Sequence, residues 1–382
     1  MPAYITDIGV FLPNSPVDNE NIEDILGLIN HKPSRTKSRI LRNNGIKFRY
    51  YAIDPYTGMQ THNNAQLTAE AIRTLSKKGD LSLEEIECLV CGTSCPDQLV
   101  PNHAVMVHGE LANPPCEVIS TSGVCCSGMT AFKYGYMSVA FGLTKNAVTS
   151  GSELVSNALR ALYFKPEIEA RIKELEEKPV IGFEKDFLRW MLSDAAAAVL
   201  IKNNPRQDGL SLRVDWVDII SFANEIETCM YAGGVKRADG SLQGWRDVEN
   251  ADEVWKEGYF NLKQDAKLLG ENVIIYGIRK GFAKVRDKYQ LTPESLNWFL
   301  PHYSSEYFRD PLYNELMNIG FPITYDKWFT NLTTKGNTGS ASIFVMLEEL
   351  MSSGELKKGE KIFCLIPESA RFSYAYMHLT VC

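Results

Sequence analysis

The segment Glu117–Lys133 constrains the fold most, because its pattern changes from that of a strand to that of a helix. Its first five residues are typical of a short buried strand, which Ser122 and Gly123 break. Apolar side chains then recur at helical spacing. We therefore expect a strand-to-helix elbow with Cys125 and Cys126 where the helix starts. Because helix N–H groups favour an anion, such a position predicts a nucleophilic thiol with a lowered pKa. The alternative is that both cysteines are small buried hydrophobes.

The composition is that of an ordinary globular protein. The chain has 382 residues, 45% of them hydrophobic and 23% charged, which fits two domains or one large layered structure. The sequence lacks an apolar stretch long enough to cross a membrane and a signal peptide, so we expect a cytoplasmic protein. The net charge of −7 argues against general nucleic-acid binding.

The nine cysteines are odd in number and scattered, which predicts reduced thiols. Cys88 and Cys91 have the spacing of a zinc knuckle, but they lie in the apolar run 86–92 and no second pair follows. We therefore expect them in the core and expect no metal site.

Strands and helices alternate along both parts of the chain. In the first part this order indicates a largely parallel sheet with covered faces. The expected strands are 4–13, 86–92, 117–121 and 146–153, and the expected helices include 68–77 and 101–111. The charged stretch 167–178 predicts an exposed helix inside an insertion of about residues 155–190.

A similar order returns in the second part of the chain. The expected elements are strands 296–302, 361–366 and 373–380, and helices 272–288, 308–317 and 339–350. This repetition suggests an internal duplication, with an N-terminal half of residues 1–205 and a C-terminal half of residues 206–382.

Three polar side chains could form a catalytic site if the halves face one another. His302 ends a strand, and Asn337 precedes a helix. A reactive cysteine needs a proton acceptor, and a carbonyl substrate needs N–H donors where negative charge develops. Cys126, His302 and Asn337 would meet both needs. Taken singly, His302 could be a hydrogen-bonded core residue and Asn337 a helix cap.

The motifs Val124–Gly128, Leu300–His302 and Lys335–Ser342 have the order and spacing of the thiolase superfamily, and the chain resembles a beta-ketoacyl-[acyl carrier protein] synthase III. The resemblance implies an α/β, five-layered αβαβα fold made of two related halves, and a homodimer. It also implies acyl substrates carried on acyl carrier protein or coenzyme A, with no other cofactor.

The resemblance also implies roles for single residues. Cys126, rather than Cys125, matches the family nucleophile because a small residue and a glycine follow it, and it would carry the acyl group. His302 and Asn337 would bind the carbonyl of the incoming thioester and stabilise its enolate. The thioester oxygen would be bound by the N–H of Cys126 and by that of Ala370 or Arg371.

The chain departs from the family pattern in two places. The turn Pro367–Phe372 replaces a glycine-rich turn, which predicts a reshaped and more polar pocket that includes Phe372. Val100 stands where an aromatic residue often lines the acyl pocket across the dimer, so a longer or branched acyl group would fit.

The combination of Cys-Ser-Gly at 126–128, Ser-Glu-Leu at 152–154 and Pro-Glu-Ser-Ala-Arg-Phe at 367–372 resembles the ketosynthase/cyclase subgroup (DarB-type). Enzymes of that subgroup make dialkylresorcinol and stilbene precursors by joining a beta-ketoacyl thioester to a second acyl unit and closing a cyclohexanedione ring. In that case Glu153 or Glu368 could assist enolisation or cyclisation. Both could equally be structural carboxylates paired with Arg160 or Arg371.

Other functions remain as alternatives: simple decarboxylative condensation in fatty acid or polyketide synthesis, acyl transfer to oxygen or nitrogen, and a non-catalytic binding role. Asn337 argues against acyl transfer, since that reaction needs no enolate stabilisation.

A basic run lies near the N-terminus of this acidic protein. It contains Lys32, Arg35, Lys37, Arg39 and Arg42, with Arg309 expected nearby. The run could dock an acidic acyl carrier protein, or it could be a solvated helix face.

Overall fold

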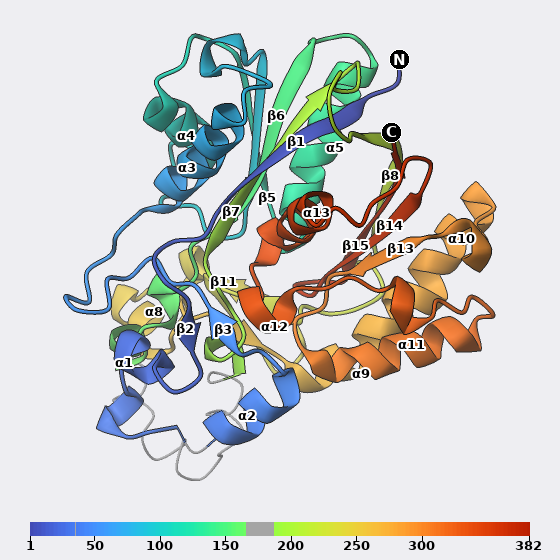
Figure 1. The fold of residues 1–382 in the computed structure, drawn as a ribbon. Coiled ribbons are helices and arrows are strands. Elements are labelled where there is room, and N and C mark those ends of the chain that lie inside the picture. Colours follow the sequence, from blue (N-terminus) through green and yellow to red (C-terminus); the bar gives the residue numbers. More distant parts are fainter. Residues whose placement is uncertain (35, 166–186) are drawn as a thin grey trace.

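The computed structural model describes residues 1–34, 36–165 and 187–382 (Figure 1). Arg35 and the predicted charged helix 167–178 lie outside the described residues. Nine strands form one sheet in the order β13-β14-β15-β8-β1-β7-β6-β4-β5. The strands are β1 (Tyr4–Phe11), β4 (Cys88–Thr93), β5 (Glu117–Ser122), β6 (Asn146–Glu153), β7 (Ala195–Lys202), β8 (Leu212–Ser221), β13 (Trp298–Pro301), β14 (Lys361–Glu368) and β15 (Ser373–Val381).

The sheet as a whole is mixed, but the four strands expected in the first part of the chain, β1, β4, β5 and β6, run in one direction, and only the intervening β7 opposes them. β4 runs parallel to β5 and β6, and β13 runs parallel to β14, but the other neighbours are antiparallel. β14 and β15 are joined by the short turn 369–372, which permits only an antiparallel pair. β1 inserts between β7 and β8 and is antiparallel to both.

The sheet has two parts, which meet where β1 joins β8 through only the pairs Tyr4–Arg213 and Ile5–Leu212. Helices α5 (Cys126–Ala140) and α13 (Ser342–Ser352) lie between the two parts, and the rings of Phe132 and Phe344 have centroids 5.8 Å apart. The predicted boundary between residues 205 and 206 falls in the loop from β7 to β8. The division into two duplicated halves stays a prediction.

Helices cover the two outer faces (Figure 1), which confirms the five-layered αβαβα arrangement. The first part is covered by α3 (Asn64–Lys77) and α4 (His103–Leu111), and the second by α9 (Ala266–Ile274), a π-helix (Ile275–Phe282), α10 (Ala283–Tyr289) and α11 (Arg309–Asn318). The predicted helix 272–288 is thus a continuous helix with a π segment in its middle.

The alanines of β7 explain how helices approach this sheet from both sides. Ala195 and Ala197 pack in the inner core with α5 and α13, whereas Ala196 and Ala198 pack on the outer side with α3. Successive side chains point to opposite faces of a strand, so a run of small residues lets both helix layers lie close.

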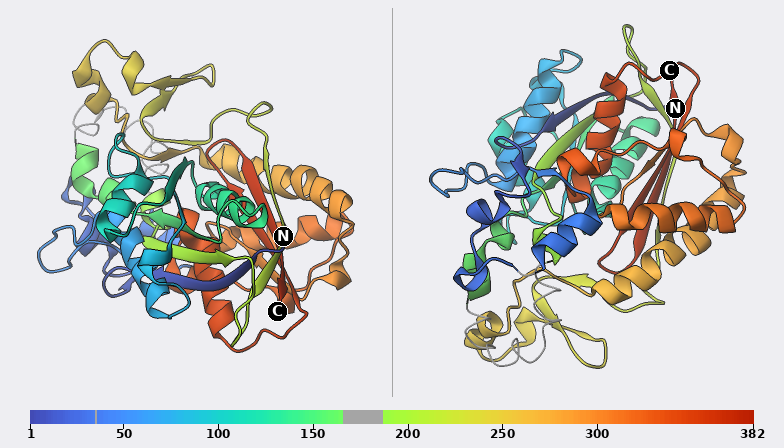
Figure 2. Two further views of the ribbon diagram at one scale, coloured as in Figure 1. Left: turned by 90° about the horizontal axis from the view of Figure 1, so that it is seen from above. Right: turned by 60° about the horizontal axis from the view of Figure 1, so that its bottom comes forward.

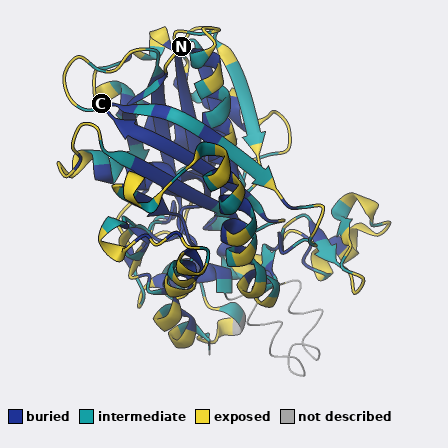
Figure 3. Ribbon diagram, turned by 90° about the vertical axis from the view of Figure 1, so that its right-hand side faces the viewer, coloured by how far each residue is buried: buried dark blue, intermediate teal, exposed yellow. Residues whose placement is uncertain are grey.

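Several short elements complete the fold. They are β2 (Val17–Asp18), α1 (Ile22–Leu26), α2 (Lys37–Asn44), β3 (Phe48–Arg49) and α12 (Leu332–Lys335). Between β8 and α9 the chain leaves the main body as the 225–265 excursion, seen in yellow in Figure 2 and as a largely exposed projection in Figure 3. It holds β9 (Met230–Tyr231), β10 (Gly234–Lys236), β11 (Leu242–Gly244), α8 (Ala251–Lys256) and β12 (Lys263–Gln264). Within the described ranges, no helix is both long enough and apolar enough to span a bilayer.

Candidate active site

A cavity of about 470 Å³ lies where several strands end. Ser94 follows β4, Cys125 follows β5, Glu153 ends β6 and His302 follows β13, and all four line the cavity. Ligands of α/β sheets commonly bind beyond the carboxyl ends of the strands. The topology therefore gathers these polar side chains at one place.

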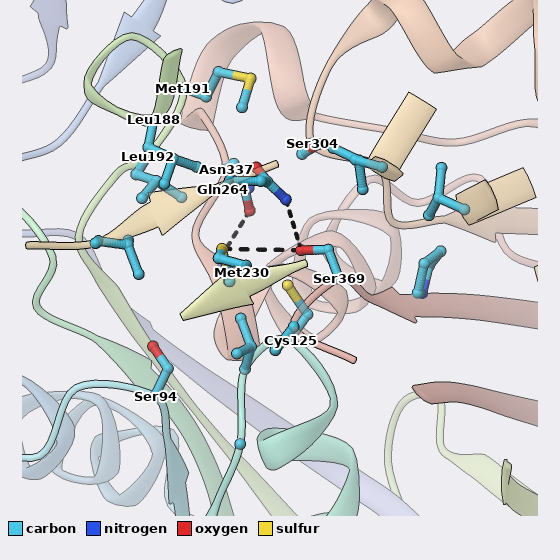
Figure 4. Close-up of a pocket in the computed structure, with 18 of the residues that line it drawn as sticks. Ser94, Cys125, Leu188, Met191, Leu192, Met230, Gln264, Ser304, Asn337 and Ser369 are labelled. Carbon is cyan, nitrogen blue, oxygen red and sulfur yellow. Dashed lines mark hydrogen bonds between the residues drawn. The ribbon is translucent and has the colours of Figure 1, made fainter. Parts of the chain in front are cut away.

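The rest of the cavity wall is predominantly apolar. Figure 4 shows Leu188, Met191 and Leu192 on one side of the cavity and Met230 near its centre. Further lining side chains come from α9, the π-helix and α11: Leu269, Val273, Ile274, Ile278 and Leu312. A cavity of this size with few polar groups suits a ligand with an apolar body and one reactive polar end.

Two glycines bring the segment that carries Asn337 against the start of α5. A Cβ atom built on Gly128 would lie 2.4 Å from the carbonyl oxygen of Ser340, and one built on Gly151 would lie 2.2 Å from the same oxygen. Only glycine permits this approach of α5 and β6 to the chain before α13.

Asn337 is 5% exposed and held at both backbone and side chain. Its backbone N–H donates to the carbonyl of Met191 at 2.9 Å, and its Oδ1 accepts the N–H of Gly339 at 3.0 Å. The N–H donors of this amide are on Nδ2. The side-chain bond closes the turn at Asn337, which also lines the cavity, but Asn337 is not the cap of the helices that follow, whose first flanking residues are Thr338 and Ala341.

His302 lines the cavity as a neutral imidazole. Its backbone N–H donates to the carbonyl of Leu365 at 2.8 Å, which fixes the residue beside β14. Burial lowers the pKa of His302 to about 4. A neutral ring offers one N–H donor and one acceptor nitrogen.

The two adjacent cysteines face different surroundings, and the structure brings Cys125 rather than Cys126 to the cavity. Cys125 lines the cavity with His302 and Asn337 (Figure 4). Cys126 begins α5, and its thiol donates to the carbonyl of Ile366 at 3.3 Å, toward β14. The nucleophilic role of Cys126 therefore stays a prediction, and it requires its thiol to turn from Ile366 to the cavity.

The expected lowering of the thiol pKa is not found, because burial raises the pKa of both Cys125 and Cys126. Burial shifts a pKa by up to about 3–5 units, equivalent to about 4–7 kcal/mol, whereas a helix N-terminus contributes at most about 2 kcal/mol. The negative charge of Glu368 raises the pKa of both thiols further. Both cysteines are therefore neutral thiols near neutral pH.

Glu153 is a fully buried carboxyl group on the cavity wall. It accepts hydrogen bonds from the hydroxyl of Ser94 and, at 3.0 Å, from the N–H of Ser340. Burial raises the pKa of Glu153 to about 7. Glu153 does not form the ion pair with Arg160 that the sequence analysis gave as an alternative. The guanidinium of Arg160 donates to the carbonyl of Gly58 instead.

The turn after β14 presents its N–H groups to Glu368 rather than to the cavity. The N–H of Ala370 donates to Oε1 of Glu368 at 2.8 Å, and the N–H groups of Arg371 and Ser373 also favour its carboxylate. The oxyanion donors predicted in this turn, the N–H groups of Ala370 and Arg371, are therefore engaged by Glu368. Burial outweighs these bonds and raises the pKa of Glu368. The Arg371 side chain donates to the carbonyl of Ile226 at 3.2 Å.

The two predicted pocket residues do not line this cavity. Phe372 is buried with φ +56° and packs against the ring of Tyr276, with centroids 5.8 Å apart, so its prediction as a pocket residue is wrong. Val100 is 82% exposed in the single chain. Its place in a partner's pocket stays a prediction.

The basic run is only partly available for docking. Lys32, Arg39 and Arg42 are exposed on or near α2. Lys37 forms an ion pair with Glu23 at 3.0 Å. Arg309 does not belong to the basic run in the sequence. Its guanidinium lies 3.8 Å from the carboxylate of Glu306 and over the ring of Tyr325.

Sequence reasoning missed the residues that the 225–265 excursion adds to the cavity. Met230 and Gln264 enter the cavity from the paired strands β9 and β12, and Gln264 donates to the hydroxyl of Ser369 at 3.1 Å (Figure 4). The strands are two residues long, so neither gives a periodic signal. Ser94 was also missed, although it lies two residues after the predicted strand 86–92.

The chain is similar in sequence to beta-ketoacyl-[acyl-carrier-protein] synthases III. Residues 287–366 match the family model described as 3-Oxoacyl-[acyl-carrier-protein (ACP)] synthase III C terminal. The chain is 23% identical over 361 residues to beta-ketoacyl-[acyl-carrier-protein] synthase III of Clostridium perfringens (strain SM101 / Type A), which covers 94% of each chain. The same enzyme of Aquifex aeolicus (strain VF5) is 23% identical over 362 residues, covering 95% of this chain and 94% of the relative.

Solved structures share the fold along the whole chain. AbyA1, a tetronic acid condensing enzyme, superposes with a TM-score of 0.76 at 17% identity and covers 99% of both chains. Xanthomonas campestris OleA with bound lauric acid and lauroyl-CoA gives a TM-score of 0.73 at 18% identity, covering 100% of this chain and 99% of that one.

Proposed function

Because the chain is a condensing enzyme of the thiolase superfamily, related to beta-ketoacyl-[acyl-carrier-protein] synthase III, we propose that it joins a beta-ketoacyl thioester to a second acyl unit and closes a cyclohexanedione ring. The observation that carries the proposal is an apolar cavity lined by a cysteine, a neutral His302 and Asn337. An acyl tail fits the apolar wall, and its thioester fits the polar end.

The first step is acyl transfer to a cysteine. The thiol sulfur attacks the thioester carbonyl, the carbon–sulfur bond to the carrier breaks, and the thiol proton leaves with the carrier sulfur. We retain Cys126 as the nucleophile on its match to the family motif, with Cys125 as the competing residue because it already lines the cavity. Both thiols are neutral, so the proton must move during the attack, and the acceptor nitrogen of neutral His302 can relay it.

The second step forms the carbon–carbon bond. The ionised carboxylate of Glu153 takes the proton from the α-carbon of the incoming thioester, so that the carbonyl oxygen becomes an enolate oxygen, and N–H donors from His302 and Asn337 stabilise the charge that develops there. The enolate carbon attacks the acyl-cysteine carbonyl, the carbon–sulfur bond breaks, and the cysteine sulfur takes up the proton and leaves as a thiol. Transfer to oxygen or nitrogen would not use these enolate donors, so Asn337 argues against that alternative.

Glu153 supports ring closure over simple decarboxylative condensation. Cyclisation needs an additional proton transfer, and a cavity carboxyl group with a pKa of about 7 can give or accept a proton near neutral pH. Simple decarboxylative condensation has no proton-transfer step that would use the carboxyl group of Glu153.

The two reactions give different products. Ring closure onto the thioester carbonyl releases the carrier thiol, whereas a linear product stays on the carrier. Incubation with a beta-ketoacyl thioester and a second acyl thioester, followed by mass analysis, should give a product free of the carrier. A carrier-bound linear product would overturn cyclisation, and an unmodified protein would overturn the condensing function.

We further propose that an acyl carrier protein delivers the substrates beside α2. A second cavity of about 210 Å³ opens there, with Arg39 and Tyr307 on its wall, and it shares Leu269 and Phe308 with the main cavity. A carrier arm could pass by this route while the acidic carrier contacts Arg39 and Arg42.

Charge reversal tests the docking surface. Arg39→Glu with Arg42→Glu should slow acylation by carrier-bound substrate about tenfold at low salt and leave a small thioester unaffected. Equal losses with both substrates would contradict docking at α2.

The protein should form a homodimer through β5. This strand pairs with β4 alone and lies at the edge of the sheet. Leu99, Val100, Val105 and Met137, next to it in the fold, are 66%, 82%, 39% and 38% exposed. An unpaired strand with apolar neighbours favours association. Sedimentation should give twice the chain mass, and a monomer at micromolar concentration would contradict it.

A further inference from the structure

We infer that Ser94 is a positioning residue for carbon–carbon bond formation: its hydroxyl holds the carboxyl group of Glu153 in the orientation and the ionised form in which it removes a proton. The inference rests on the proposed function, because Glu153 is the base assigned there. Both residues line the cavity. Ser94 acts through Glu153 and does not itself carry the proton.

The first observation is that the carboxyl group of Glu153 is held from three sides. Glu153 ends β6, and its Oε2 accepts a hydrogen bond from the hydroxyl of Ser94, which follows β4. Its Oε1 accepts the N–H of Ser340 at 3.0 Å, from the 3-10 helix that precedes α13. A Cβ atom built on Gly339 would lie 2.6 Å from Cγ of Glu153. The side chain therefore has a fixed orientation, and the Ser94 hydroxyl holds one of its two oxygens.

The second observation is that the Ser94 hydroxyl is oriented as a donor to Glu153. Its Oγ lies 3.3 Å from Sγ of Cys95. Burial raises the pKa of Cys95, so this thiol keeps its proton and donates a hydrogen bond to the Ser94 oxygen. The hydroxyl proton of Ser94 is then directed to Glu153. A donor aimed at a carboxyl oxygen stabilises the carboxylate relative to the protonated acid.

The third observation is that burial and hydrogen bonding nearly balance at Glu153. Burial raises its pKa, hydrogen bonds from Ser94 and Ser340 lower it, and the resulting pKa is about 7. Among these hydrogen bonds, the one from the Ser94 hydroxyl has the largest effect. About half of the Glu153 side chains are therefore ionised at neutral pH, and loss of the Ser94 hydroxyl would leave most of them protonated.

The other titratable groups around Glu153 have pKa values away from this range. The segments after β4 and β5 bring the thiols of Cys95 and Cys125, whose pKa values burial raises. Asp194 precedes the β7 partner of Glu153 and has a pKa of about 6, and His302, which shares the cavity, has a pKa of about 4. The 3-10 helix before α13 carries no titratable side chain. Their contributions are common to wild type and a Ser94 variant and cancel when the two are compared.

The test measures carbon–carbon bond formation from the preformed acyl-enzyme between about pH 6 and about pH 9.5, with the product identified by mass. The wild-type rate should rise with pH through about 7 and then level off. Ser94→Ala should move this midpoint upward by about one to two pH units, which is the effect of one hydrogen bond to a charged group. Its rate near pH 7 should therefore fall about 5- to 50-fold, and near pH 9 it should lie within about twofold of wild type.

Two variants separate this effect from a general loss of structure. Ser94→Thr keeps the hydroxyl and should keep the wild-type midpoint. Ser352→Ala is the matched control, because the Ser352 hydroxyl also donates to a glutamate, Glu348, at 3.0 Å, but lies exposed outside this cavity. It should leave the rate and the midpoint unchanged. Acylation of the cysteine does not use Glu153, so an unchanged acylation rate in Ser94→Ala shows that this variant is folded.

Two results would overturn the role of Ser94. One is a Ser94→Ala profile with the wild-type midpoint, and the other is a loss of rate of the same size near pH 7 and near pH 9. Failure of the proposed function would look different. Glu153→Gln would then condense as fast as wild type, or the wild-type protein would give no condensed product at any pH.

Discussion

Glu153→Gln should change how stability depends on pH. In the folded protein Glu153 has a pKa of about 7, whereas the ordinary pKa of a glutamate in an unfolded chain is 4.5. Because this pKa is raised in the folded protein, the contribution of Glu153 to the free energy of unfolding is fully present below pH 4.5. It is lost as the pH rises through 7. The shift of about 2.5 units corresponds to about 3 kcal/mol. Glutamine keeps an acceptor for the N–H of Ser340 and carries no charge.

The quantity to measure is the difference in unfolding free energy between Glu153→Gln and wild type, from urea titrations at about pH 5 and about pH 9. The variant should gain about 3 kcal/mol relative to wild type over this interval. Contributions common to both proteins cancel, including that of Asp194, whose pKa burial raises to about 6. Glu355→Gln, at an exposed carboxylate, is the control. A difference that stays constant with pH would refute the assigned burial of Glu153.

Three further predictions follow from the packing and charges of the site. Asn337→Ala should slow carbon–carbon bond formation by about 10²–10³ while the acyl adduct still forms; equal loss of both steps would contradict its role toward the enolate. Gly151→Ala should lower the unfolding free energy by about 1–3 kcal/mol in urea titration, because a Cβ would lie 2.2 Å from the Ser340 carbonyl oxygen, whereas Gly109→Ala, with no atom within 4 Å, should not destabilise. Glu368→Gln should speed iodoacetamide labelling of the cysteine pair, because the charge of Glu368 raises the pKa of both thiols; an unchanged rate would contradict this coupling.

The sequence was sufficient to place the backbone of the site. The change of period in Glu117–Lys133 correctly predicted β5 and α5, and the strand before His302 and the helix after Asn337 were also correct. These elements have strong local signals: buried strands, helical spacing and glycine breaks. The layered fold follows from how such elements cover one another.

The directions of individual side chains and N–H groups could not be predicted in the same way. Which of Cys125 and Cys126 faces the cavity depends on the position of the Ile366 carbonyl, which is far along the chain. The N–H of Ala370 turns to Glu368 because a buried carboxylate competes for it. The acidity of the thiols was misjudged because the cost of burial depends on tertiary packing and exceeds the local effect of the helix.

The part of the cavity wall that comes from the 225–265 excursion also could not be predicted from the sequence. Its strands contain only two or three residues each, and their pairing is fixed by contacts to the turn after β14. Leu242 and Phe260 carry no motif that would distinguish them from other exposed apolar residues.

The most direct test of the account is to locate the acyl group. The purified protein is incubated with an acyl-CoA, digested and mapped by mass, alongside variants in which Cys125 and Cys126 are replaced by alanine singly and together. The account predicts an adduct of one acyl group on the peptide that contains this pair, lost in the double variant. An adduct on another cysteine, or one that survives the double replacement, would contradict it.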